Sequence, residues 1–174
     1  AYEIPKRDWS SDVCSSDLSL YGGAKLRGWR AFALPLALMV ATDILLYYVD
    51  GYAAAGFRMF RFNTPFIYAA FLINVLIGRA LLKKFSVARL GAATLLCSTQ
   101  FFLITNFAVW LASDGAAGLG NYPHTLAGLI ACYVAALPFF GTTLAGDALY
   151  TAAMFGLHHA AERAQSAKPA EAAA

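Results

Sequence analysis

The chain has 174 residues, of which 60% are hydrophobic, 14% aromatic and only 13% charged, with a formal net charge of +3. Soluble domains usually carry about 25% charged residues, so this composition indicates a protein whose solvent is largely lipid. The small and scattered positive charge argues against nucleic-acid binding. Three cysteines without a Cys-x-x-Cys pair predict neither a disulfide framework nor a metal site. We expect no cofactor.

Residues 1–19 differ from the rest of the chain because they are polar and serine-rich and lack an apolar period. The segment Asp8–Leu18, DWSSDVCSSDL, resembles the translation of a common sequencing adapter. We therefore expect residues 1–19 to be non-native or disordered, and we take no site residue from them.

Apolar runs predict an all-α fold, a polytopic membrane helix bundle over residues 20–159. Crossing ~30 Å of hydrocarbon takes about 20 helical residues. Helices are expected at 30–49, 65–82, 90–111 and 142–159. The segment 124–140 is short for a span and contains Pro138, so it either crosses or re-enters, and we favour re-entry. This gives about five membrane segments, followed by a disordered tail at 160–174.

Basic residues indicate how the bundle is oriented. They gather at the ends of the predicted helices that would share one membrane face, at Lys25, Arg27, Arg30, Lys83, Lys84 and Arg89. Cytoplasmic loops carry an excess of Lys and Arg, so this face is predicted to be cytoplasmic. We expect a multi-pass protein of the bacterial inner membrane, with Arg58, Arg61 and the loop carrying Asp114 facing outward.

Polar residues on helix 90–111 suggest a binding face. Thr99, Asn106 and Trp110 lie within about 40° of one another at 100° per residue. An amide and an indole one turn apart form a recognition edge for a solute. They can equally form a helix–helix hydrogen bond and an interfacial anchor, and the sequence leaves both interpretations open.

A second polar stripe occurs on helix 142–159, at Thr143, Asp147, Tyr150, Thr151, Met154 and His158. Asp147 is either a solute ligand or a carboxylate placed by the helix dipole near the helix start. Tyr122 and Thr125 follow a glycine-rich outer loop and are expected to face the same cavity, with His124 as a cap. The predicted substrate-binding residues are Asn106, Trp110, Tyr122, Thr125, Asp147 and Tyr150.

An intramembrane aspartyl protease is the sharpest enzyme alternative, because Asp43 and Asp147 lie in two different predicted helices. Such enzymes carry Tyr-Asp and Gly-x-Gly-Asp motifs, whereas this chain has Thr42-Asp43 and an alanine before Gly146-Asp147. Both motifs match only by half. We therefore expect no enzyme and no catalytic residue.

Several segments together resemble an uncharacterised bacterial family of putative membrane transport proteins: SLYGGAKLRGW, PLALMVATDILL, ITNFAVWL, YPHTLAGLIACYVAALPFF and TLAGDALYTAAMFG. That family is similar to the substrate-specificity (S) components of energy-coupling-factor (ECF) vitamin transporters. The Pro138-Phe139 and Gly146-Asp147 pairs resemble a pattern in biotin-type S components. Tyr150 stands where those proteins have a lysine, so the resemblance does not identify the solute.

The resemblance implies six membrane segments, a small-molecule solute bound near the outer face, and delivery through an ECF transmembrane coupling subunit and its ATPases. It implies no chemistry on the solute. The first helix of that fold would be missing or overwritten here. The alternative from another class is a membrane scaffold or assembly protein, in which the polar faces are helix contacts.

Overall fold

Helices make up the fold throughout the described part of the chain, residues 8–26, 28–49, 62–113 and 122–171 of this computed structural model. In chain order they are α1 (Asp8–Lys25), α2 (Arg30–Val49), α3 (Thr64–Leu81), α4 (Val87–Leu111) and α5 (Leu126–Glu171). No strand occurs in these ranges. The all-α class predicted from the sequence is confirmed.

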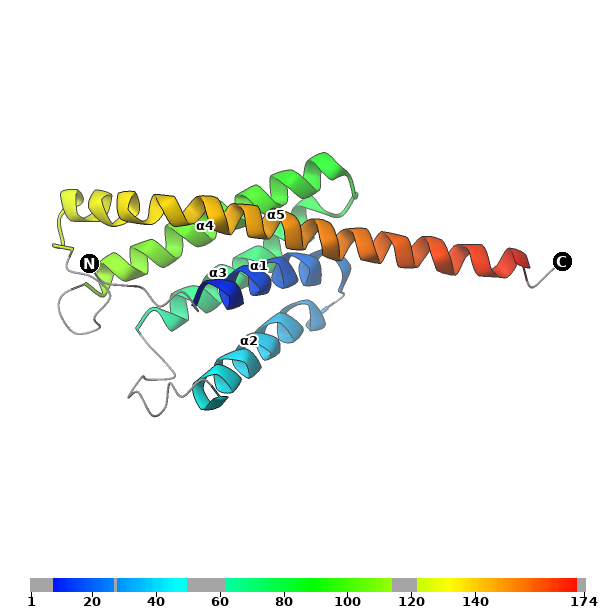
Figure 1. The fold of residues 1–174 in the computed structure, drawn as a ribbon, viewed down its shortest axis with the longest axis horizontal. Coiled ribbons are helices and arrows are strands. Elements are labelled where there is room, and N and C mark those ends of the chain that lie inside the picture. Colours follow the sequence, from blue (N-terminus) through cyan, green and yellow to red (C-terminus); the bar gives the residue numbers. More distant parts are fainter. Residues whose placement is uncertain (1–7, 27, 50–61, 114–121, 172–174) are drawn as a thin grey trace.

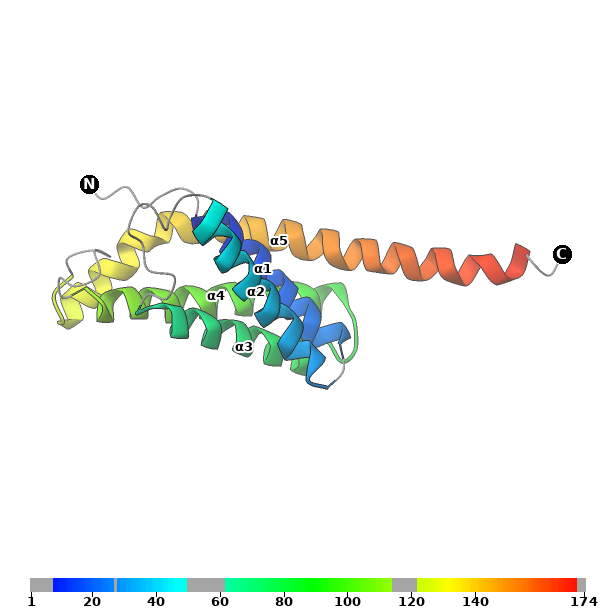
Figure 2. The ribbon, with the colours of Figure 1, turned by 90° about the horizontal axis from the view of Figure 1, so that it is seen from below.

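The helices form a bundle in which α1 has the central place. It packs against each of the other four helices, while α4 lies between α3 and α5. Figures 1 and 2 show that the connections 26–29 and 82–86 lie at one end of the bundle, from which α5 projects far beyond the other helices. α2 and α4 end, and α3 and α5 begin, toward the opposite end.

Three helices in the described ranges are long and apolar enough to cross a membrane: α3, α4 and Leu126–Ser166 of α5. Their outward side chains are largely apolar; Leu126 is 73% exposed and Leu149 69%. Large apolar side chains exposed along whole helices are costly in water and favourable in hydrocarbon. The bundle is therefore built for a lipid environment.

Local signals explain where the predicted helices begin and end. The predicted helix 30–49 coincides with α2, and the other two early helices differ from α3 and α4 by one to three residues at their ends. Ser86 caps α4, since its hydroxyl accepts the Arg89 N–H at 3.2 Å. Pro65 occupies the first turn of α3, where its missing N–H costs nothing.

The prediction of two separate segments at 124–140 and 142–159 is wrong. One continuous helix, α5, runs from Leu126 to Glu171 through Pro138 and Gly141, so the favoured re-entrant segment is not formed. Proline removes a single N–H bond, and the bonds on either side hold the helix together. Figure 2 shows the first part of α5 inclined to the remainder. α5 also includes residues 160–171, and the expected disorder of the tail 160–174 stays a prediction.

The N-terminal segment forms the helix α1 from Asp8, and the expectation that residues 1–19 are non-native or disordered stays a prediction. Ser19 and Leu20 are fully buried, and Thr151 of α5 donates a hydrogen bond to Asp17 at 2.6 Å. Packing through small residues explains why no apolar period was needed. The adapter origin of the segment stays a prediction, and residues 1–7 lie outside the described ranges.

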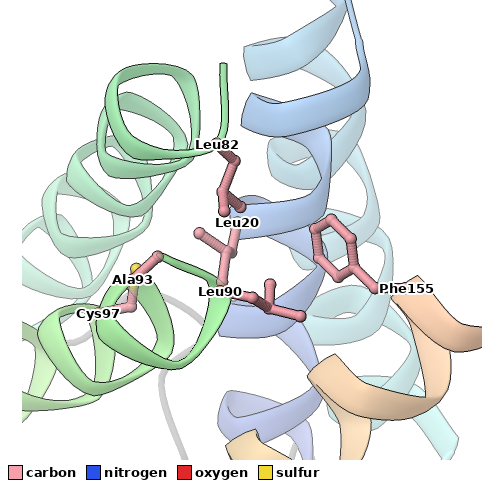
Figure 3. Packing of buried hydrophobic residues seen from close by; sticks show 6 residues of the cluster. All are labelled: Leu20, Leu82, Leu90, Ala93, Cys97 and Phe155. Carbon is pink, nitrogen blue, oxygen red and sulfur yellow. The ribbon is translucent and has the colours of Figure 1, made fainter. Parts of the chain in front are cut away.

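The contact between α1 and α3 depends on glycine. A Cβ atom added at Gly78 would overlap the Leu20 carbonyl oxygen, and one added at Gly23 would overlap the Val75 carbonyl. Missing side chains let two helix backbones approach closely. Beside this contact lies the apolar core cluster drawn in Figure 3, formed by Leu20, Leu82, Leu90, Ala93, Cys97 and Phe155.

We predict that Gly78→Ala lowers the free energy of unfolding by about 1–3 kcal/mol, because the new methyl group forces α1 and α3 apart. Gly91→Ala is the matched control, since nothing lies within 4 Å of a Cβ at that exposed helical position. It should be neutral or stabilising by up to about 1 kcal/mol. Unfolding in mixed micelles measures both, and equal stabilities of the two variants would contradict the close contact.

Candidate functional site

Three aromatic rings meet at the end of the bundle where α4 ends and α5 begins. The ring centroid of Trp110 lies 5.5 Å from that of Phe107 and 5.1 Å from that of His124. We call these three side chains the terminal aromatic cluster. Phe107 and His124 are exposed and Trp110 is half-buried, so the cluster lies at the surface of the bundle.

Hydrogen bonds to the main chain hold two of these rings in place. The Trp110 indole N–H donates to the Pro123 carbonyl at 3.1 Å. His124 Nε2 lies 3.1 Å from the Trp110 carbonyl, which fixes the tautomer with a proton on Nε2 as the donor. The two bonds join the end of α4 to the start of α5. Because the polar edges are occupied, the ring faces are what remain for contact with a ligand.

Thr125 is the N-cap of α5. Its hydroxyl oxygen accepts the Gly128 N–H at 3.2 Å, which satisfies one of the free donors at the helix start. Gly128 is required here, since a Cβ would overlap the Pro123 carbonyl. Tyr122 is half-buried just before this turn. Thr125 thus caps the start of α5, while His124 binds the Trp110 carbonyl in the last turn of α4.

Asn106 lies on the seam between α4 and α5, one helical turn before Trp110. Its side-chain Nδ2 donates to the Phe102 carbonyl of its own helix at 2.8 Å. Its main-chain carbonyl accepts from the Cys132 thiol at 3.5 Å. Close by, the Tyr133 hydroxyl donates to the Leu103 carbonyl at 2.7 Å. Asn106 thus contributes to the helix pair as well as lying near the ring cluster.

Asp147 lies elsewhere. Its side chain is only 2% exposed, and the Ser98 hydroxyl on α4 lies 2.5 Å from its Oδ2 atom. The 22 residues between Thr125 and Asp147 correspond to about 33 Å of helix. Tyr150 is 44% exposed and points away from the buried face. The single cavity expected to join these residues to Trp110 is therefore not formed, and Asp147 is far from any helix start.

An amide pair between α3 and α4 was missed by the sequence analysis. Gln100 Nε2 donates to Asn74 Oδ1 at 2.6 Å and to the Ala70 carbonyl at 3.1 Å. Asn74 is fully buried, and its Nδ2 atom and the Gln100 Oε1 atom have no partner. Nothing in the sequence alone pairs Asn74 with Gln100.

The two aspartates considered for a protease do not meet. Asp43 on α2 accepts a hydrogen bond from the Tyr68 hydroxyl of α3 at 2.8 Å. Asp147 lies between α4 and α5, and α2 does not pack against α5. A shared-water dyad of these two carboxyl groups is not formed. Across the described residues, no group of three or more potential metal ligands occurs either.

We predict that Asp147→Asn leaves the free energy of unfolding within about 1 kcal/mol of the original value. The Ser98 hydroxyl carries one proton but lies 2.5 Å from Asp147 and 2.9 Å from the Thr94 carbonyl. An asparagine amide can donate to Ser98 while Ser98 donates to Thr94, so all three groups stay satisfied. Asp147→Ala leaves a cavity and should cost about 2–4 kcal/mol. Equal losses for both variants would contradict this hydrogen-bonded role.

Comparisons with known proteins give one match. Residues 16–170 match a family of unknown function, DUF6580. No curated protein and no solved structure matches the chain. The matched range runs from within α1 almost to the end of α5 and so includes the terminal aromatic cluster, the amide pair and Asp147. The chain belongs to the DUF6580 family of unknown function.

Proposed function

We propose that the protein is a multi-pass solute-binding protein of the bacterial inner membrane, resembling the S component of an ECF vitamin transporter. The observation that carries the proposal is the terminal aromatic cluster. Trp110 and His124 are held by main-chain hydrogen bonds, yet neither ring is buried. Rings that are already oriented lose little entropy when a ligand stacks on them. Such a surface suits a planar, partly aromatic solute.

The site we propose comprises the aromatic cluster and the neighbouring predicted residues. Trp110 and Tyr122 would stack on the solute, while Asn106 and Thr125 would supply hydrogen-bonding edges beside it. Asp147 and Tyr150 are left out of direct solute contact because of their distance along α5. In this proposal the solute binds at the end of the bundle, and the buried Asp147 forms hydrogen bonds in its interior.

The orientation follows from a single crossing by α5. With α2, α3, α4 and α5 each crossing once, one side carries the ends of α2 and α4 and the starts of α3 and α5. The opposite side carries Arg30, Lys83, Lys84 and the C-terminal part of α5. The basic side is assigned to the cytoplasm, as membrane proteins retain Lys and Arg there. The aromatic cluster then faces outward, where a solute arrives.

Transfer of the solute would require partners. As the resemblance to S components implies, we propose an ECF transmembrane coupling subunit with its ATPases. The alternative is a scaffold or assembly protein, and one observation favours it. Asn106 and Ser98 form hydrogen bonds within or between helices, and the Trp110 N–H binds the Pro123 carbonyl just before α5. A ligand experiment directed at the ring faces separates the two proposals.

We predict opposite sidedness for Phe62 and Ser166. Both are exposed, before α3 and near the end of α5. With the native cysteines replaced by alanine, single cysteines at 62 and 166 should react with an impermeant maleimide from the periplasmic and the cytoplasmic side respectively. A cysteine at the exposed Lys84 serves as a second cytoplasmic reporter. Labelling of 62 and 166 from the same side would reject a single crossing by α5.

We predict that a vitamin or nucleobase-like solute raises the thermal stability of the purified chain and quenches its tryptophan fluorescence. Saturation at 100 times the dissociation constant should add about 2.7 kcal/mol of stability. Trp110→Ala should reduce the affinity for that solute by about fivefold or more, since stacking on one ring contributes about 1–3 kcal/mol.

Trp29→Ala is the matched control. Trp29 is 74% exposed and lies just before α2, at the other end of the bundle. Its removal should leave the solute affinity unchanged. If no vitamin or nucleobase-like solute stabilises the protein, although both variants fold normally, the scaffold alternative is favoured. Equal losses of affinity in the two variants would place the solute outside the aromatic cluster.

A further inference from the structure

One end of the bundle carries a surface of basic side chains, at the end opposite the terminal aromatic cluster. We call it the basic end surface. Its members are exposed and come from the ends of four helices and one connection: Lys25, Arg30, Arg79, Lys83, Lys84 and Arg89. The helix ends and connections that carry them lie together in both views of the bundle (Figures 1 and 2).

Within the described residues, an ion pair with a carboxylate reaches Lys25 of this surface. Glu162 is the acidic residue that approaches it, and Glu162 already binds Lys25 at 3.5 Å and His158 at 2.9 Å. The ion pairs recorded in the described ranges include none with Lys83, Lys84 or Arg89. The surface therefore keeps a strong net positive charge.

Exposed apolar groups lie among the basic ones. Trp29 is 74% exposed, Phe85 52% and Val87 80%. Phe85 is adjacent to Lys84, and Trp29 is adjacent to Arg30. Phe85 is also anchored to the bundle, since its ring stacks on Phe155 of α5 at 5.8 Å. Aromatic and apolar groups beside lysine and arginine suit the depth of lipid headgroups, where each ring has an apolar body and a wet edge.

We propose that the basic end surface binds the headgroups of anionic phospholipids, with Lys83, Lys84 and Arg89 contacting phosphate and Trp29, Phe85 and Val87 inserted at headgroup depth. The charge of the surface complements an anionic leaflet and not a zwitterionic one. Lipid at this height also fits the exposed apolar side chains of α3 and α4, two helices long and apolar enough to cross a membrane. This inference does not depend on solute binding.

The test compares lipids around the full-length protein in nanodiscs. Spin-labelled phosphatidylglycerol and phosphatidylcholine report the relative association of each lipid with the protein. We expect a preference for phosphatidylglycerol that weakens at high salt, because added ions screen the charges. Replacing Lys83, Lys84 and Arg89 by glutamine should lower the preference by about fivefold per charge removed, as expected for basic groups at a lipid surface.

The matched control keeps the charge: Lys83→Arg, Lys84→Arg and Arg89→Lys together should retain the preference. If the wild-type protein shows no preference for phosphatidylglycerol over phosphatidylcholine at low salt, the proposal is overturned. The surface would then be expected to bind an acidic protein partner. An unchanged preference in the glutamine variant would overturn it as well. If inorganic phosphate displaces spin-labelled phosphatidylglycerol as well as phosphatidylglycerol vesicles do, the proposal is also overturned, and the surface is a site for free anions.

Discussion

The unbroken course of α5 through Pro138 sets the position of the other features of this protein. In hydrocarbon each unpaired main-chain group is costly, so a helix that continues is favoured over a chain that turns within the bilayer. Proline gives up one bond, whereas a break with a turn would give up several. Because α5 continues, Trp110 and His124 meet at its start, Ser98 meets Asp147 along its length, and Tyr21 meets His158 beyond them.

The early helices were predictable because each apolar run is bounded by residues that act locally. Arg30 precedes α2, Pro65 occupies the first turn of α3, and Ser86 caps α4. The same local reasoning failed at α5, where proline and glycine normally mark an end. What keeps α5 helical is the rest of the helix and its packing on α4, and neither is visible in a short window of sequence. The helix α1 was not predicted from the sequence for a related reason. Its contact with α3 depends on the absence of side chains at Gly23 and Gly78, which gives no apolar pattern.

The candidate site was predictable in part. Sequence spacing placed Asn106 and Trp110 one turn apart, as the structure has them, and it placed Tyr122 and Thr125 just before the next helix. A helical period gives the angle of a residue around an axis but not which height of a neighbouring helix it meets. Asp147 was therefore assigned to the wrong height. Gln100 escaped because its partner, Asn74, comes from a helix that the sequence could not pair with α4.

The two ends of the bundle are chemically different, and α5 is the helix that joins them. From Leu126 to His158 it covers 32 residues, or about 48 Å, too far for any direct interaction between the ends. The terminal aromatic cluster lies at the first end and presents ring faces. The basic end surface lies at the second end and presents positive charge. Two buried hydrogen bonds lie between the ends: Thr151–Asp17 joins α5 to α1, and Ser98–Asp147 joins α4 to α5.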